Sequence, residues 1–298
     1  MAEQTSTFSQ LKARPGVRSA QYAKKAIVRG LHYLVLVVLS CIFLVPLAWM
    51  ISTSLKEQGQ VFAYPPVWIP HPVRWDNYAE AMQRAPLLLW LRNTAIITVA
   101  AVLGTVLSSS LVGFGFARLR FPGRDWLFVL LLATMMLPGV VTLIPRFILF
   151  RAVGWIDTFY PLIVPAFLGG GAFNIFLVRQ FYLTIPTDFD DAARVDGASS
   201  WRIWWDILVP LSSPVLTAIA IFAFVYHWNE FLEPLVYLQS EDKKTLALGL
   251  RAFINPMDAS WNISMAASMF LVVPILVLFL LGQRYFVRGV VMTGIHGR

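Results

Sequence analysis

Six apolar runs, each long enough to cross a bilayer, constrain this fold more than any other feature of the sequence. They lie at residues 33–53, 93–116, 126–150, 159–182, 214–238 and 265–286. At 1.5 Å per residue, about 20 helical residues cover a hydrocarbon core about 30 Å thick. Because backbone groups inside lipid must bond to one another, runs of this length favour helices. We therefore expect an all-α membrane protein with six transmembrane helices.

Composition agrees with a membrane protein. The chain is 58% hydrophobic and 13% charged, whereas a typical soluble domain is about 25% charged. The single cysteine, Cys41, lies inside the first run, which excludes a disulfide framework within the chain and predicts a buried thiol. Because the first run follows a polar, basic leader, we expect no cleavable signal peptide.

The distribution of lysine and arginine predicts the orientation of the spans. Six spans place both termini on one side, and that side holds fifteen of the 24 basic residues. Basic residues concentrate on the cytoplasmic side, so we expect both termini in the cytoplasm. The organisation would be a cytoplasmic leader at 1–28, partly disordered, a membrane domain at 29–286 and a cytoplasmic tail at 287–298. With the charge spread over membrane flanks, we expect no nucleic-acid binding.

Residues 185–210, between the fourth and fifth runs, are too polar for a membrane span. Thr187 is suited to cap a helix whose first turn carries three aspartates, where the helix dipole favours negative charge. Gly197 can adopt the left-handed conformation that ends this helix, and Ser199 or Ser200 can cap a second one. The stretch therefore predicts two short helices that meet at a glycine.

The second of these helices carries an apolar stripe at i, i+3, i+4 and i+7, namely Trp201, Trp204, Trp205 and Leu208. Such a stripe could be buried at the membrane interface or in a groove of a second protein. An interfacial helix would explain the tryptophans, but it would not explain the spacing of the residues that precede them.

That spacing resembles the EAA loop of binding-protein-dependent ABC importer permeases: Glu-Ala-Ala, three residues, Gly, nine residues, then Ile-x-Leu-Pro. Asp191-Ala192-Ala193, Gly197 and Ile207-Leu208-Val209-Pro210 stand at these distances. Asp191 replaces the glutamate and Val209 the leucine. The resemblance implies a type I importer permease fold, in which this cytoplasmic loop docks into a cleft of an ATPase subunit. The residues that it implies for ATPase coupling are Asp191, Ala192, Ala193, Asp196, Gly197, Ala198 and Trp201.

Three further segments resemble the carbohydrate branch of this family, specifically the smaller subunit of the maltose type. They are the Trp-Asn-Glu-Phe run at 228–231, Asn77-Tyr78, and the ending from 286 to 297. The resemblance implies a bacterial inner-membrane importer of a sugar, working by alternating access. Its partners would be a second permease subunit, a dimer of ATP-binding subunits and an extracytoplasmic solute-binding protein. Thr293 and Gly294 would lie at the ATPase interface.

The chain carries no phosphate-binding Gly-x-x-x-x-Gly-Lys-Ser/Thr loop, so ATP and magnesium would be held by the partner ATPase. We expect no cofactor bound by this chain itself. Its four histidines have no metal-ligand spacing, and no set of residues marks a catalytic site. We therefore expect a translocation subunit and not an enzyme, with no metal and no catalytic residue.

Ionisable residues inside spans are rare and usually functional. Asn229 and Glu230 fall in the outer half of the fifth run, and we expect them to line the pathway or its gate, or else to bond neighbouring helices. Glu233 would reach the outer interface. The prolines and glycines at 138–145 and 169–171 would be tolerated kinks or points of bending.

Other interpretations remain open at this point. An importer of an amino acid, a phosphonate or a polyamine would share the same loop. An ion-coupled secondary transporter could use Glu230 as its coupling site, although neither internal repeats nor paired broken helices are apparent in the sequence. A membrane scaffold without transport activity is a further alternative.

Overall fold

The computed structural model describes residues 15–253 and 260–294, and their side chains over 27–253 and 260–282. The described residues form helices and loops without a strand. The main helices are α1 (Pro15–Ser54), α2 (Asp76–Arg84), α3 (Leu87–Arg118), α4 (Arg124–Thr134), α5 (Gly139–Ala152), α6 (Tyr160–Phe167), α7 (Ala172–Thr184), α8 (Asp188–Val195), α9 (Ser200–Arg202), the π-helical η2 (Ile203–Leu208), α10 (Val209–Leu211), α11 (Ser213–Asn229), α12 (Leu232–Tyr237), α13 (Leu246–Gly249) and α14 (Trp261–Gly294). The expectation of an all-α protein is confirmed.

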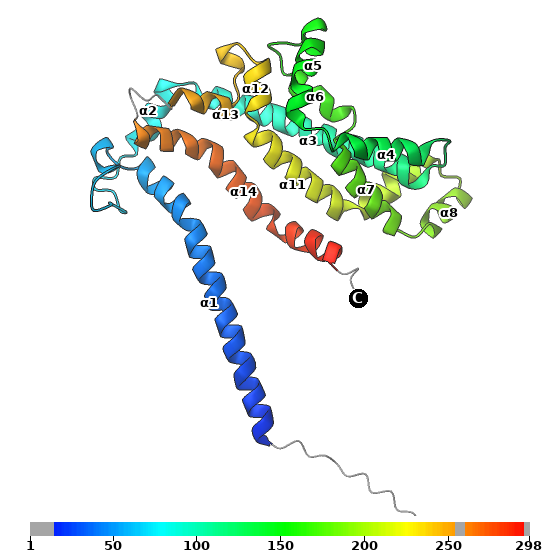
Figure 1. Cartoon of the computed structure of the whole chain (residues 1–298), viewed down its shortest axis with the longest axis horizontal. Helices are drawn as coiled ribbons and strands as arrows, with labels where there is room; N and C mark the ends of the chain where they lie inside the picture. The colour runs from blue at the N-terminus through cyan, green and yellow to red at the C-terminus, as the bar shows by residue number, and fades with distance from the viewer. Residues whose placement is uncertain (1–14, 254–259, 295–298) are drawn as a thin grey trace, which may run out of the picture.

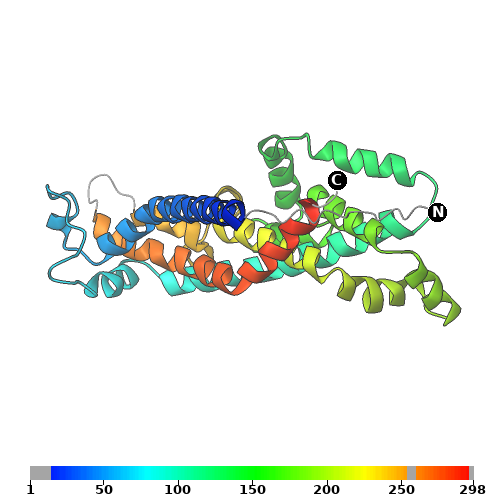
Figure 2. The ribbon, with the colours of Figure 1, turned by 90° about the horizontal axis from the view of Figure 1, so that it is seen from below.

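Four segments are long and apolar enough to be single spans: 27–54, 87–118, 160–184 and 261–282. The third of these consists of α6 and α7, with a break at 168–171. The predicted third span is instead the pair α4 and α5, which bends by 101° next to Pro138 (Figure 2). Proline disfavours helical geometry in the residue before it and removes a backbone donor, which explains the position of the break.

The predicted fifth span also differs from a continuous helix. α11 ends at Asn229, and α12 begins at Leu232, so the predicted span of 214–238 is interrupted at Glu230. The chain also bends by 79° where α10 meets α11, next to Pro214. By length and composition, the described residues therefore hold four single spans and two bent pairs of helices, the second of which joins 200–211 to 213–229.

The long helix α3 lies at the centre of the packing and contacts α6, α7 and α11 (Figure 1). Small residues on α3 allow this close approach. A Cβ atom on Gly113 would lie 2.8 Å from Val178 of α7, and one on Gly104 would lie 2.6 Å from the ring of Phe167 in α6. Any larger side chain at either position would separate the helices.

The helix α1 runs away from the other helices along most of its length (Figure 1), and its apolar side chains are exposed in the isolated chain. Cys41 is among the exposed residues, so the expectation of a buried thiol is wrong for this chain alone. The helix begins at Pro15, so residues 15–28 are helical, where partial disorder was expected. Proline fits the first turn of a helix, and the following alanines have high helix propensity.

At the other end of the chain, α14 continues to Gly294. The residues assigned to the cytoplasmic tail are therefore helical from 287 to 294, and residues 295–298 lie outside the described part. Thr293 and Gly294 are the last two residues of this helix.

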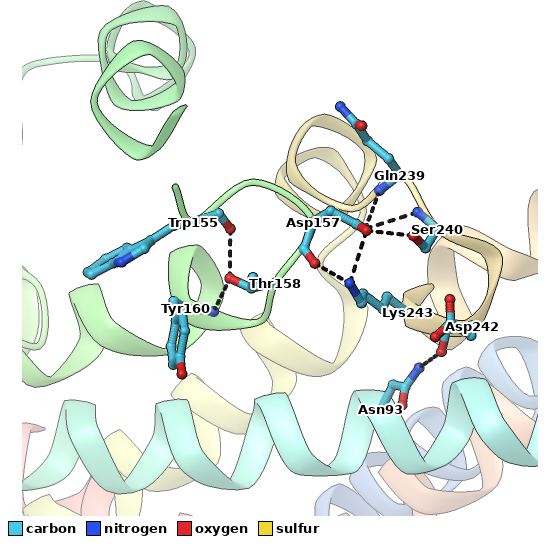
Figure 3. Close-up of polar contacts among 9 residues, drawn as sticks. All are labelled: Asn93, Trp155, Asp157, Thr158, Tyr160, Gln239, Ser240, Asp242 and Lys243. Atoms are coloured by element: carbon cyan, nitrogen blue, oxygen red, sulfur yellow. Dashed lines mark hydrogen bonds and ion pairs between the residues drawn. The ribbon is translucent and has the colours of Figure 1, made fainter. Parts of the chain in front are cut away.

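Two loops are joined through Asp157, which lies between α5 and α6 (Figure 3). Its carboxylate accepts hydrogen bonds from the backbone N–H groups of Gln239 and Ser240, at 3.0 and 2.9 Å, and from the Ser240 hydroxyl. The Lys243 ammonium lies 3.0 Å from the same carboxylate. These donors hold the pKa of Asp157 well below its usual range. A single carboxylate thus joins two loops that are about 80 residues apart in the sequence.

We expect the substitution Asp157→Asn to lower the free energy of unfolding by about 2 kcal/mol at neutral pH, because it removes charge-assisted hydrogen bonds. Asp157 has a φ of 60°, a conformation that asparagine also tolerates, so the backbone is preserved. Thermal unfolding in detergent would measure the effect, with the exposed Glu241→Gln as control.

The same pair of proteins gives a pH test. A folded-state pKa below the unfolded value of about 3.9 contributes stability above that pH, and this contribution is lost as the pH falls. The difference in melting temperature between the wild type and Asp157→Asn should therefore shrink between pH 7 and pH 3. A constant difference would contradict the assignment to the charged carboxylate.

Candidate functional site

The polar stretch of residues 185–210 forms a compact knob at the end of the molecule opposite α2 and α13 (Figure 1). Gly197 has a φ of 77°, which confirms the predicted left-handed residue between the two short helices. Ser199 caps the second helix, since its hydroxyl accepts a hydrogen bond from the Arg202 N–H at 3.4 Å. Thr187 stands at the expected cap of α8, but its side chain makes no capping bond. Its carbonyl accepts from the N–H groups of the residues that follow.

The predicted tryptophan stripe is divided between two surfaces. Trp204 and Leu208 are buried in the core of the protein, while Trp201 and Trp205 are exposed. Residues 203–208 form a π-helical turn, and its wider spacing moves side chains away from the α-helical positions that the stripe assumed. The prediction of one continuous stripe, buried at the membrane interface or in a groove of a second protein, is therefore wrong, because half of the stripe anchors the knob to its own chain.

Trp204 also makes a buried polar contact. Its indole Nε1–H donates to the Ser110 hydroxyl of α3 at 3.0 Å, and that hydroxyl lies 2.7 Å from the Tyr182 hydroxyl of α7. Around these groups, apolar side chains of α3, α7, η2 and α11 form one cluster. The second half of the knob is thus fixed to three long helices.

The first half of the knob presents an open groove of about 550 Å³. Its lining residues are Pro186, Asp188, Phe189, Ala192, Ala193, Asp196 and Ile207. The groove therefore brings together three of the predicted coupling residues, Ala192, Ala193 and Asp196. Alanine side chains leave room for a partner to approach this surface closely.

The remaining coupling candidates lie around this groove. The Asp191 carboxylate is exposed and lies 3.0 Å from the Arg194 guanidinium. Gly197 is exposed, Ala198 is half-buried and packs against the core cluster, and Trp201 is exposed and lies beside Trp204. Their role in coupling stays a prediction.

A buried ion pair beneath the knob was not predicted from the sequence. Arg118, in the last turn of α3, places its Nε atom 3.0 Å from Oδ2 of Asp190 in α8. Both side chains are at least 96% buried, and the Arg118 guanidinium also donates to the Ile185 carbonyl at 2.7 Å. Burial raises the pKa of Asp190, while Arg118 opposes this shift. The sequence did indicate a further acidic residue here, because Asp190 directly precedes the Asp-Ala-Ala pattern. Its partner Arg118, however, lies 72 positions earlier in the chain.

Asn229 and Glu230, the predicted pathway residues, lie where α11 breaks. Glu230 accepts hydrogen bonds from the N–H groups of Leu232 and Glu233, at 3.0 and 3.2 Å, and so caps α12. The Asn229 side chain is exposed and donates to the Val225 carbonyl at 2.8 Å. Glu233 pairs with Arg146 of α5 at 2.8 Å, so it joins two helices, whereas it was expected to reach the outer interface.

The described residues contain no group of three or more histidine, cysteine or acidic side chains that could hold a metal ion.

A family model for the inner-membrane component of binding-protein-dependent transport systems matches residues 102–292, from the middle of α3 to near the end of α14. The chain belongs to this family. The resemblance inferred from the loop at 185–210 is confirmed, and the permease is a multi-pass inner-membrane protein.

Two relatives align along most of the permease. It is 34% identical over 247 residues to the arabinooligosaccharides transport system permease protein AraQ of Halalkalibacterium halodurans, covering 83% of this chain and 86% of that protein. It is 33% identical over 274 residues to the sn-glycerol-3-phosphate transport system permease protein UgpE of Yersinia pestis, covering 88% and 97%.

A solved structure confirms the fold class. One chain of a bacterial ABC transporter involved in the import of the acidic polysaccharide alginate superposes with a TM-score of 0.78. The match has 22% sequence identity and covers 88% of the permease and 98% of that chain. The permease therefore has the type I importer permease fold.

We expect Trp204→Phe to destabilise the permease by about 1–2 kcal/mol, because it removes a buried hydrogen bond and leaves unfilled volume. Trp205→Phe is the matched control, since Trp205 is half exposed. Melting temperatures of the two variants in detergent would be compared with that of the wild type. Equal shifts would contradict the division of the stripe into a buried and an exposed half.

Proposed function

We propose that the permease is the translocation subunit of an ATP-driven importer for a carbohydrate or a related sugar phosphate. The observation that carries this proposal is the exposed groove on a knob that bears the Asp-Ala-Ala…Gly pattern. The relatives are described as transport permeases for arabino-oligosaccharides and for sn-glycerol-3-phosphate, which supports the substrate class.

The energy source is a separate ATPase that holds ATP and magnesium. The sequence supports this arrangement because it contains no phosphate-binding loop. The ATPase docks on the cytoplasmic groove, where Asp191 supplies a polar contact, the small Ala192 and Ala193 allow close approach, and Gly197 sets the angle between the two short helices. Thr293 and Gly294, at the end of α14, reach the same ATPase interface.

Transport follows alternating access. ATP binding closes the pair of ATPase subunits, and this closure rotates the knob within the cleft of the ATPase that holds it. Because Trp204 and Leu208 are buried among the long helices, a rotation of the knob is passed to α3, α7 and α11. The cavity between the two permeases then opens outward, and hydrolysis resets it.

The assembly contains a second permease subunit and an extracytoplasmic binding protein that delivers the solute. The exposed apolar surface of α1 supports a neighbour in the membrane, either lipid or the second permease. With both termini and the knob in the cytoplasm, the outer loops joined by Asp157 face the binding protein.

Asn229 and Glu230 lie beside the translocation pathway. Asn229 and Tyr226 are exposed in the isolated chain and lie within the predicted fifth span, where polar side chains facing lipid hydrocarbon would be costly. A water-filled pathway at the contact with the second permease relieves this cost. Glu230 caps α12 with its carboxylate, a role that requires no proton transfer and so favours the importer over ion-coupled transport.

We expect the affinity-purified wild-type permease to retain both an ATPase with a phosphate-binding loop and a second six-span permease. Gly197→Val should retain the second permease and lose most of the ATPase, because a β-branched residue at a φ of 77° is strained. Gly197→Asn is the control, since asparagine tolerates this conformation. A permease that purifies alone and carries solute under an ion gradient would overturn the proposed function.

Cysteine labelling tests the pathway. In a Cys41→Ser background, the thiol of Asn229→Cys should react with a membrane-impermeant thiosulfonate in the assembled importer, and transported solute should slow the reaction. Leu281→Cys, on the apolar exposed surface of α14, is the control and should react at least tenfold more slowly. Equal rates at the two positions would contradict a pathway role for Asn229.

A further inference from the structure

The helix α8 is held to the rest of the chain differently from the second half of the knob. The structure describes all eight residues of α8, and Asp190 is the buried one among them, while Ala193 is half-buried and the other six are exposed. By contrast, η2 is anchored by Ile203, Trp204 and Leu208 within the core cluster. Side-chain anchoring of α8 therefore rests mainly on one carboxylate.

That carboxylate contacts α3 directly. The Asp190–Arg118 contact of 3.0 Å joins α8 to the last turn of α3, which spans the membrane. Arg118 also holds the Ile185 carbonyl, at the start of the knob, so one guanidinium fixes both the entry to the knob and its first helix. By connectivity alone, α8 would be joined only to α7 before it and to α9 after it.

Stability does not explain why this pair is charged. Two buried charges lose their hydration, and this loss commonly cancels or exceeds their attraction. The geometry here is also incomplete, because Oδ1 of Asp190 has no hydrogen-bond partner and Nε of Arg118 lacks one of good geometry. Replacing a buried ion pair by apolar side chains of similar volume is often neutral or stabilising. What a charged pair adds is a defined orientation, because a displaced buried charge loses its counterion at high cost.

We propose that the Asp190–Arg118 ion pair is the positioning device that orients α8, whose residues line the groove proposed for the ATPase, and carries the movement of this helix directly to α3. This inference rests on the proposed importer function. It adds a path by which movement of α8 reaches α3, and the docking groove alone does not provide such a path. Neither residue touches ATP or solute, and both act through the position of the groove residues Ala192, Ala193 and Asp196.

The test uses the whole importer, with both permeases and the ATPase pair, reconstituted in proteoliposomes with its binding protein. The double variant Asp190→Leu with Arg118→Met replaces the ion pair by apolar side chains of similar volume and leaves no buried charge unpaired. The control is the double variant Arg124→Gln with Asp125→Asn, which removes an exposed ion pair on the same side of the membrane. ATP hydrolysis and solute uptake are measured together, so that the amount of solute moved per ATP is obtained.

We expect the apolar variant to assemble with the second permease and to melt as the wild type does. Its solute uptake per ATP should fall at least tenfold, or its ATPase should dissociate at least tenfold more readily, while the control matches the wild type. The single variant Asp190→Glu keeps the negative charge beside Arg118, so it should retain more solute uptake per ATP than the apolar double variant. A purely structural role would not require this difference.

Two results would overturn this inference. One is an apolar variant with wild-type uptake per ATP and wild-type retention of the ATPase, which would make the pair a neutral packing element. The other is an apolar variant that no longer binds the second permease, which would assign the pair to folding. Failure of the proposed function is distinguished from both, because it would appear in the wild type as the absence of ATP-driven uptake.

Discussion

The close packing of α3 against α6, α7 and α11 is the constraint on which the rest of the structure depends. Inside lipid there is little hydrophobic gain in bringing two helices together, so contact relies on close approach and on a few buried polar bonds. Gly104 and Gly113 provide the approach, and the Ser110 hydroxyl provides a polar bond to Tyr182 and Trp204. With α3 in place, both ends of the molecule have a common support.

The two ends are attached to α3 in different ways. At the end that carries α2 and α13, the side chains of Trp90 and Asn93 donate to carbonyl groups of residues 241–244, and these loops are further joined by Asp157. At the opposite end, Arg118 pairs with Asp190 and the tryptophan of η2 reaches Ser110. The rotation of the knob that we propose for transport therefore acts on the same helix that supports the loops at the other end. In the proposed mechanism, this arrangement gives alternating access a physical route through the chain.

The breaks near Pro138, near the glycines at 169–171 and near Pro214 occur where the sequence carries proline or glycine, but their consequences were not evident from the sequence. Pro138 marks a bend of 101°, much larger than a tolerated kink. The three glycines at 169–171 all have positive φ, yet 160–184 still serves as one span. Gly170 lies so close to α3 that a Cβ atom would be 2.6 Å from the Thr105 carbonyl. Gly170 thus serves close packing against α3, while all three glycines allow the positive φ values at this break.

The sequence by itself determined the membrane class, the approximate spans, the family and the left-handed Gly197, because these depend on local composition and on fixed spacing. Only the tertiary structure decided which tryptophans face the core, that Glu230 caps a short helix, and that Asp190 has a buried partner. Each of these depends on residues brought together from distant helices, and the π-helical turn at 203–208 changes the periodicity that a sequence argument must assume. A carboxylate in a polar loop looks exposed in sequence, and only the position of Arg118 at the end of α3 shows that Asp190 is buried.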